Sequence, residues 1–169
     1  MQRVLSALIV VVALVGSAAC AKPVPNFAGA WDFDVEATKA SAAEAKMDGL
    51  ALFMEHFTTD QNAKTFSMKV ELGQMIVTAV YNLDGSVSKN MSPSGTSGQP
   101  PIEVVSNAKW EGKTLVVTST SSSPSANGPI EVKSTRKLWL DDKGRLVIER
   151  IGTPETLVRP SRSVYKRKT

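Results

Sequence analysis

The chain has 169 residues, 42% of them apolar and 21% charged, and its formal net charge at pH 7 is +4. This length fits one domain with a sizeable core, and the composition is that of an ordinary globular protein. The only cysteine, Cys20, excludes an internal disulfide.

Charge is distributed unevenly along the chain. Residues 26–60 carry seven acidic side chains against two lysines, and residues 150–169 carry six basic side chains against one glutamate. A basic tail can indicate a nucleic acid or an anionic membrane surface. Nucleic-acid binding would also need aromatic side chains interleaved with the basic ones, and this tail lacks that pattern. We therefore expect no nucleic-acid partner, and we expect the two segments to be neighbouring strands whose charges neutralise each other.

Residues 1–21 have the layout of a secretory signal peptide. A short positive start, Met1–Arg3, precedes the apolar run Val4–Val15 and the small residues Gly16–Ala21. The apolar run is shorter than the roughly 20 residues that a membrane span needs. The sequence therefore predicts export, to the periplasmic side of the cell envelope.

Cys20 stands at the expected cleavage point. The small residues before it resemble a bacterial lipobox, although Ser17 occupies the position where that pattern usually has leucine. The resemblance implies that Cys20 is lipidated and becomes the mature N-terminus, which would be the only link to a membrane. The alternative is soluble export, with cleavage after Ala21.

Residues 22–26 form a proline-rich tether, and residues 27–169 form the folded domain. Trp31, Phe33 and Val35 alternate with acidic side chains, which predicts a first strand over Gly29–Glu36. Thr38 then provides a cap for a short helix that ends near Gly49.

The rest of the chain alternates with the period of β-strands. Turn signals such as Asp84-Gly85 separate the strands into hairpins, and Ser86–Pro101 is predicted to be a long loop. The predicted strands are Leu52–Thr59, Thr65–Leu72, Met75–Leu83, Ile102–Trp110, Thr114–Ser121, Ile130–Leu140, Leu146–Gly152 and Ser161–Arg167. Short connections favour an all-β fold, an antiparallel up-and-down β-barrel of about 8–9 strands with a short helix after the first strand.

Four short motifs resemble those of the lipocalin-like (calycin) β-barrel family. They are Gly29-Ala30-Trp31, Leu83-Asp84-Gly85, Trp110-Glu111-Gly112 and Arg162-Ser163-Val164-Tyr165. The match is closer still to small exported bacterial lipocalin-like proteins, and it covers residues 27–168. The resemblance implies that Trp31 plugs the closed end of the barrel and that Arg162 packs over its ring. It implies a cavity and does not extend to any particular ligand.

The sequence offers little for catalysis or metal binding. His56 is the only histidine, and no cysteine or paired carboxylates accompany it. A metal site needs several such ligands, and acyl transfer needs a nucleophile, a base and an orienting group. We therefore expect no metal, no cofactor and no enzymatic activity.

Two arginines share their strand face with apolar side chains. Arg136 has the parity of Val132 and Leu138, and Arg150 has the parity of Ile148. If those faces line the barrel interior, both arginines point inward and suit a carboxylate or phosphate head group. The alternative is that they lie in water at the barrel mouth, or that a bulge reverses the parity.

Ser134 shares the same face, as do Ser119 and Ser121, and these small side chains leave room inside the barrel. The sequence therefore favours a monomeric, non-enzymatic binding protein of the cell envelope. Its ligand would be a small hydrophobic or anionic amphiphilic molecule held by Arg136, Arg150 and Ser134. The alternative is a periplasmic protein-interaction module whose filled barrel binds a partner through its loops or outer face.

Overall fold

The computed structural model describes residues 23–49, 55–94, 99–125 and 127–168. The elements are β1 (Gly29–Phe33), α1 (Val35–Ala45), β2 (His56–Gln61), β3 (Thr65–Leu72), β4 (Met75–Asn82), β5 (Val87–Ser92), β6 (Ile102–Glu111), β7 (Thr114–Ser123), β8 (Ile130–Leu140), β9 (Leu146–Thr153) and β10 (Ser161–Arg167). The predicted signal peptide, Cys20 and the start of the strand predicted over Leu52–Thr59 lie outside these residues.

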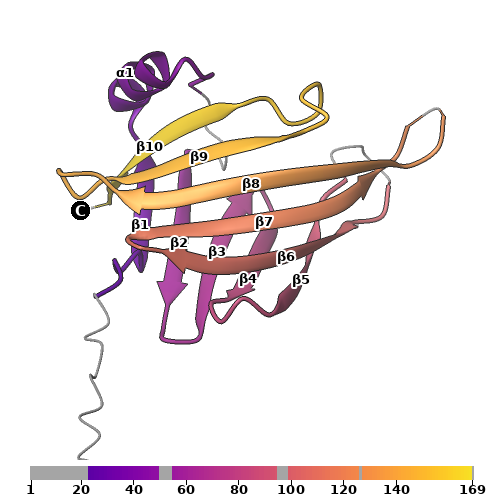
Figure 1. Ribbon diagram of the computed structural model, residues 1–169, viewed down its shortest axis with the longest axis horizontal. Helices are drawn as coiled ribbons and strands as arrows, with labels where there is room; N and C mark the ends of the chain where they lie inside the picture. The colour runs from indigo at the N-terminus through magenta and orange to yellow at the C-terminus, as the bar shows by residue number, and fades with distance from the viewer. Residues whose placement is uncertain (1–22, 50–54, 95–98, 126, 169) are drawn as a thin grey trace, which may run out of the picture.

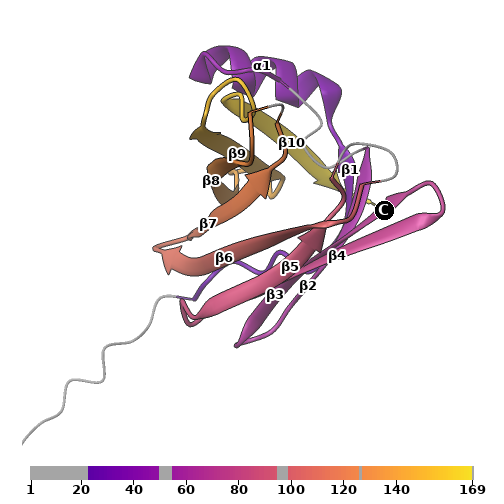
Figure 2. The same cartoon turned by 90° about the vertical axis from the view of Figure 1, so that its right-hand side faces the viewer.

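All ten strands belong to one antiparallel sheet in the order β4-β3-β2-β1-β10-β9-β8-β7-β6-β5. Each strand pairs with its neighbour in the chain, except that β4 and β5 do not pair, and the pairing of β1 with β10 curls the sheet into a barrel. Asp32 lies opposite Lys166 in that pair, as the opposite charges of the two ends predicted. Figure 1 shows β6–β9 running across β2–β5, and Figure 2 shows these two groups as the facing walls of the barrel.

The predicted loop over Ser86–Pro101 contains the strand β5, so the barrel has ten strands instead of eight or nine. The sequence of β5, Val-Ser-Lys-Asn-Met-Ser, has no apolar alternation that would mark it. Its pairing partner is the longer strand β6, where Val87 lies opposite Asn107. Cross-strand hydrogen bonding, which a local pattern does not reveal, makes this segment a strand.

The helix begins four residues earlier than the sequence predicted. Asp34, and not Thr38, is the N-cap, and its carboxylate accepts a hydrogen bond from the Ala37 amide at 3.0 Å. Val35 therefore lies in α1 and is exposed, although its alternation with Trp31 suggested a strand. The helix ends at Ala45, and its C-cap is Lys46, whose left-handed backbone replaces the predicted glycine stop.

α1 lies over the end of β10, where β1 no longer covers that strand (Figure 1). The hydroxyl of Thr38 accepts a hydrogen bond from the Val164 amide at 2.9 Å, and Thr38 is buried. Thr38, which was expected to cap the helix, therefore bonds to the edge of β10 that β1 leaves unpaired. Among the residues that the structure describes, no helix is long and apolar enough to cross a membrane.

Candidate functional site

The barrel interior is packed at one end and hollow at the other. The hollow part is a cavity of about 420 Å³, which begins at Met68 on β3 and extends to Leu72 at the end of that strand. Pro93, just after β5, and Ser121 on β7 also line it. Met91 both lines the cavity and is 55% exposed, so the cavity reaches solvent beside β5.

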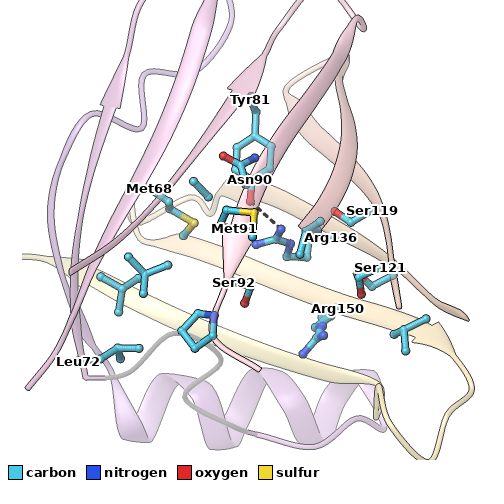
Figure 3. A pocket seen from close by; sticks show the side chains of 17 residues that line it. Met68, Leu72, Tyr81, Asn90, Met91, Ser92, Ser119, Ser121, Arg136 and Arg150 are labelled. Atoms are coloured by element: carbon cyan, nitrogen blue, oxygen red, sulfur yellow. Dashed lines mark hydrogen bonds between the residues drawn. The ribbon is translucent and has the colours of Figure 1, made fainter. Parts of the chain in front are cut away.

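Two chemically different walls face each other across this cavity (Figure 3). The wall formed by β3 and β4 is apolar and contains Met68, Val70, Leu72, Val77 and Ala79. The wall formed by β7, β8 and β9 carries Ser119, Ser121, Ser134, Arg136 and Arg150. Such a cavity is complementary to a molecule with an apolar body and a polar group on one side.

Arg136 points into the cavity from β8, as its parity predicted. Its Nη2 donates a hydrogen bond to the Tyr81 hydroxyl at 2.7 Å, and its guanidinium carbon lies 5.4 Å from the centre of the Tyr81 ring. Tyr81 belongs to β4 on the opposite wall. The contact therefore crosses the barrel and fixes the position of a charge inside it.

Arg150 lies directly opposite Arg136 in the register of β8 and β9, and it lines the same cavity. Burial lowers the pKa of Arg150 below its ordinary value, and the nearby positive charge of Arg136 lowers it further. No hydrogen bond or ion pair joins its side chain to another residue within the described part of the chain. Both arginines thus face the interior, and the alternative of a reversed parity is not observed.

Ser134 also lines the cavity, two residues before Arg136 on the same face of β8. Ser119 lies opposite Ser134 in the next strand, and its hydroxyl is 2.9 Å from that of Ser106, with which it shares a hydrogen bond. The three residues predicted to bind a ligand, Arg136, Arg150 and Ser134, therefore lie together on one wall of the cavity. The small hydroxyl side chains of Ser119 and Ser121 lie on the same wall.

The barrel is not closed by a backbone ladder between β4 and β5, which stand at the two ends of the sheet order. Side chains connect them instead. The side-chain oxygen of Asn90 accepts a hydrogen bond from the backbone N–H of Val80 at 2.7 Å. The side-chain NH₂ group of Asn90 donates a hydrogen bond to the backbone carbonyl of Val80 at 3.0 Å. The Ser88 hydroxyl accepts a hydrogen bond from the Asn82 amide at 2.8 Å. Because Asn90 also lines the cavity, this seam belongs to the cavity wall.

Trp31 closes the packed end of the barrel, as the resemblance implied. It is fully buried, and its indole N–H donates to the Phe27 carbonyl and to the Thr59 hydroxyl, both at 3.0 Å. Phe27 is also fully buried and packs against Phe66 and Trp110. The residues just after the tether therefore seal the barrel at the end away from the cavity.

The arginine over Trp31 is Arg167, and not Arg162. The guanidinium carbon of Arg167 lies 4.6 Å from the centre of the Trp31 ring, because the two residues are partners in the register of β1 and β10. Arg162 has the opposite parity from the buried Ser163 and therefore points outward. There it lies over Trp139 and binds Glu149 at 2.6 Å.

Gly29 has a backbone conformation at this end that favours glycine. Its φ of 144° lies in a region that side chains disfavour, and a Cβ there would come within 2.6 Å of the Arg167 guanidinium. The same guanidinium donates to the Ala28 carbonyl at 2.6 Å. The Gly-x-Trp motif therefore provides both the plug and the space for the arginine that covers it.

His56 takes no part in the cavity. It lies on the outer surface, where its Nδ1 is 2.6 Å from the Asp32 carboxylate. The described residues contain no group of three or more histidine, cysteine or acidic side chains arranged to hold a metal ion.

Sequence reasoning missed three polar cavity residues, Tyr81 on β4 and Asn90 and Ser92 on β5. Tyr81 shares its parity with Val77 and Ala79, so its inward position could have been read from the alternation of β4. Asn90 could not have been found, because β5 itself was predicted to be a loop.

No known family of protein sequences matches this chain. No curated protein is detectably similar to it in sequence. Solved structures do match its fold. One is a crystal structure of a mutant of the fluorescent protein UnaG, which is 17% identical with a TM-score of 0.52, and the match covers 85% of this chain and 96% of that one. At this level of identity the likeness is one of fold alone, an antiparallel up-and-down β-barrel.

Proposed function

We propose that this protein binds one small amphiphilic molecule in the cavity. The apolar body of the ligand lies along the wall formed by β3 and β4, and its anionic head lies beside Arg136 and Arg150 on the opposite wall. The observation that carries the proposal is the pair of inward arginines in a cavity whose other described lining residues are all uncharged.

The energetics of buried charge support an anionic head. A charge withdrawn from water is costly unless it is paired, and guanidinium groups pair best with carboxylate or phosphate oxygens. Asp and Glu are absent from the lining residues that the structure describes, so a ligand is the natural source of the negative charge. The cavity volume lies within the range of about 300–1,000 Å³ that small-molecule sites span.

We assign a binding role and not a catalytic one. The described lining residues offer hydrogen-bond donors and apolar surface, whereas a general base or a nucleophile–base pair is the feature that hydrolytic or transfer chemistry would need. The protein would carry, store or sense its ligand.

We further propose that the protein is exported and held at the periplasmic face of the envelope by a lipid on Cys20. The chain is fixed at Phe27, at the end of the barrel away from the cavity. An anchor a few residues before Phe27 would leave the cavity facing away from the membrane. Labelling with a lipid precursor tests this: the wild-type protein should be labelled and Cys20→Ala should not, and equal labelling would rule the anchor out.

Native mass spectrometry of the full chain, purified from its own host, tests the binding function. We expect a retained small-molecule mass that disappears on denaturation. Arg136→Leu should lose that mass, while Arg159→Leu, which removes an exposed arginine outside the cavity, should keep it. A chain without bound mass that also takes up no fatty acid or phospholipid on incubation would contradict the proposal and favour a protein partner.

A further inference from the structure

Two like charges stand directly opposite each other on the polar wall. Arg136 and Arg150 are register partners on the antiparallel strands β8 and β9, and both side chains enter the cavity. Residues opposite each other in such a pair have Cβ atoms about 4.5–5.5 Å apart, and like charges at this position are unfavourable. The fold therefore maintains a local repulsion that an apolar or neutral pair would avoid.

The surrounding acids do not relieve this repulsion. Glu149, the neighbour of Arg150, points outward and binds Arg162 at 2.6 Å. Glu131 on β8 binds Lys133 at 2.8 Å, and both of these side chains are exposed. Arg136 has the Tyr81 hydroxyl as a hydrogen-bond partner, but that group is neutral when protonated. Among the described residues that line the cavity there is no aspartate or glutamate, so a bound ligand is the natural source of counter-charge for this pair of arginines.

We propose that the head group of the ligand carries two negative charges, which Arg136 and Arg150 bind together. The chemical class is a phosphate monoester of a hydrophobic alcohol, or a head with two adjacent carboxylates. This inference rests on the proposed function and names the class of molecule that the cavity takes.

The geometry of the donors fits such a head. A guanidinium presents a planar fork of N–H groups that pairs with two oxygens, and a phosphate monoester offers three terminal oxygens to two such forks. Ser134, on the same face of β8 as Arg136, adds a hydroxyl donor beside them. A single carboxylate would leave one positive charge unbalanced in a partly desolvated site, so it should bind more weakly.

A series of ligands with one chain length and different heads tests the proposal. Decyl phosphate, decyl sulfate, decanoate and decanol are titrated into the full chain by calorimetry, below their micelle concentrations. Phosphate and sulfate share a tetrahedral shape and differ in charge, so their ratio isolates the second charge. We expect decyl phosphate to bind about tenfold more tightly than decyl sulfate, as one additional charge-assisted interaction would give. Decylmalonate, which carries two adjacent carboxylates, distinguishes a phosphate site from a general two-charge site.

Arg150→Gln is the decisive variant. It should reduce the ratio of phosphate to sulfate affinity to about one and leave sulfate binding within about threefold of wild type. Arg159→Gln removes the same charge from an exposed position outside the cavity and should leave the ratio unchanged. Equal affinity of the wild type for decyl phosphate, decyl sulfate and decanoate would overturn the two-charge head while keeping the proposed function. Failure of all five ligands to bind would overturn the proposed function itself.

The pH dependence gives an independent readout. The second pKa of a phosphate monoester is about 6, so the negative charge of decyl phosphate grows between about pH 5 and about pH 7.5. The negative charge of a sulfate ester stays the same over this range. The ionisable side chains among the described lining residues are Arg136, Arg150 and Tyr81, and none of these lining residues is a histidine, aspartate or glutamate, the side chains that ordinarily titrate in or near this range. Affinity for decyl phosphate should therefore rise with pH while affinity for decyl sulfate stays constant. Parallel behaviour of the two ligands would contradict the proposal.

Discussion

Arg167, in the last strand, covers the ring of Trp31, in the first, at 4.6 Å from guanidinium carbon to ring centre. The same guanidinium donates to the backbone carbonyls of Ala28 at 2.6 Å and Asn26 at 3.0 Å. One side chain thus ties the end of the chain to the segment that enters the barrel, and it completes the closed end.

Replacing Arg167 by alanine should lower the free energy of unfolding by about 1 kcal/mol, because a cation–π contact is lost. Loss of the two hydrogen bonds to backbone carbonyls adds to this effect. Chemical denaturation followed by tryptophan fluorescence measures the change. Lys166→Ala, on an exposed neighbour in the same strand, is the control and should change stability little. An equal loss in both variants would show that Arg167 has no particular role in closing the barrel.

Phe27→Ala should be strongly destabilising, by about 3 kcal/mol or more, because it removes a buried aromatic ring and leaves a cavity. Phe27 is fully buried and packs against Phe66, with ring centres 6.0 Å apart, and Trp110, at 5.4 Å. Val24 precedes it and is 46% exposed, so Val24→Ala should have almost no effect. Denaturant midpoints of the two variants provide the comparison. A small effect of Phe27→Ala would mean that the barrel end is sealed without it.

Asn90→Ala should loosen the seam between β4 and β5. The variant leaves both the Val80 amide and the Val80 carbonyl without their hydrogen-bond partner. We expect faster hydrogen exchange in β4 and a loss of stability of about 1–2 kcal/mol. Exchange measured by mass spectrometry on peptides from β4 reports the first effect. Lys89→Ala, at an exposed neighbour on β5, should leave exchange in β4 unchanged, and equal exchange in both variants would contradict the role of Asn90.

Tyr81→Phe tests whether the hydroxyl positions Arg136. The variant keeps the ring under the guanidinium and removes the hydrogen bond of 2.7 Å. Affinity for anionic amphiphiles should fall by roughly fivefold, as the loss of one hydrogen bond predicts. Affinity for decanol, which carries no charge, should not change, and this separates positioning of the arginine from damage to the cavity. An equal loss for both ligands would indicate damage.

Much of the fold follows from local alternation. The strands β3, β8 and β10 have the bounds that the sequence predicted. The regular alternation of burial along β3 is the pattern on which such a prediction depends. The inward direction of Arg136 and Arg150 follows from the same regularity. Alternation fails where a strand is short or ends early: β5 has no apolar row, and β1 ends at Phe33 because Asp34 caps a helix.

The sequence by itself determined an antiparallel barrel and the strand face that carries Arg136, Arg150 and Ser134, because a side-chain period of two assigns each residue to a face. The role of Trp31 as a plug was implied by the resemblance to lipocalin-like barrels. The tertiary structure decided which residues on those faces meet. Register between β1 and β10 placed Arg167 over Trp31 and sent Arg162 outward to Glu149. Contact across the barrel joined Tyr81 to Arg136, and side chains of β5 closed the seam with β4. These pairings connect distant segments, and a local pattern contains no information about the register or curvature that brings such segments together.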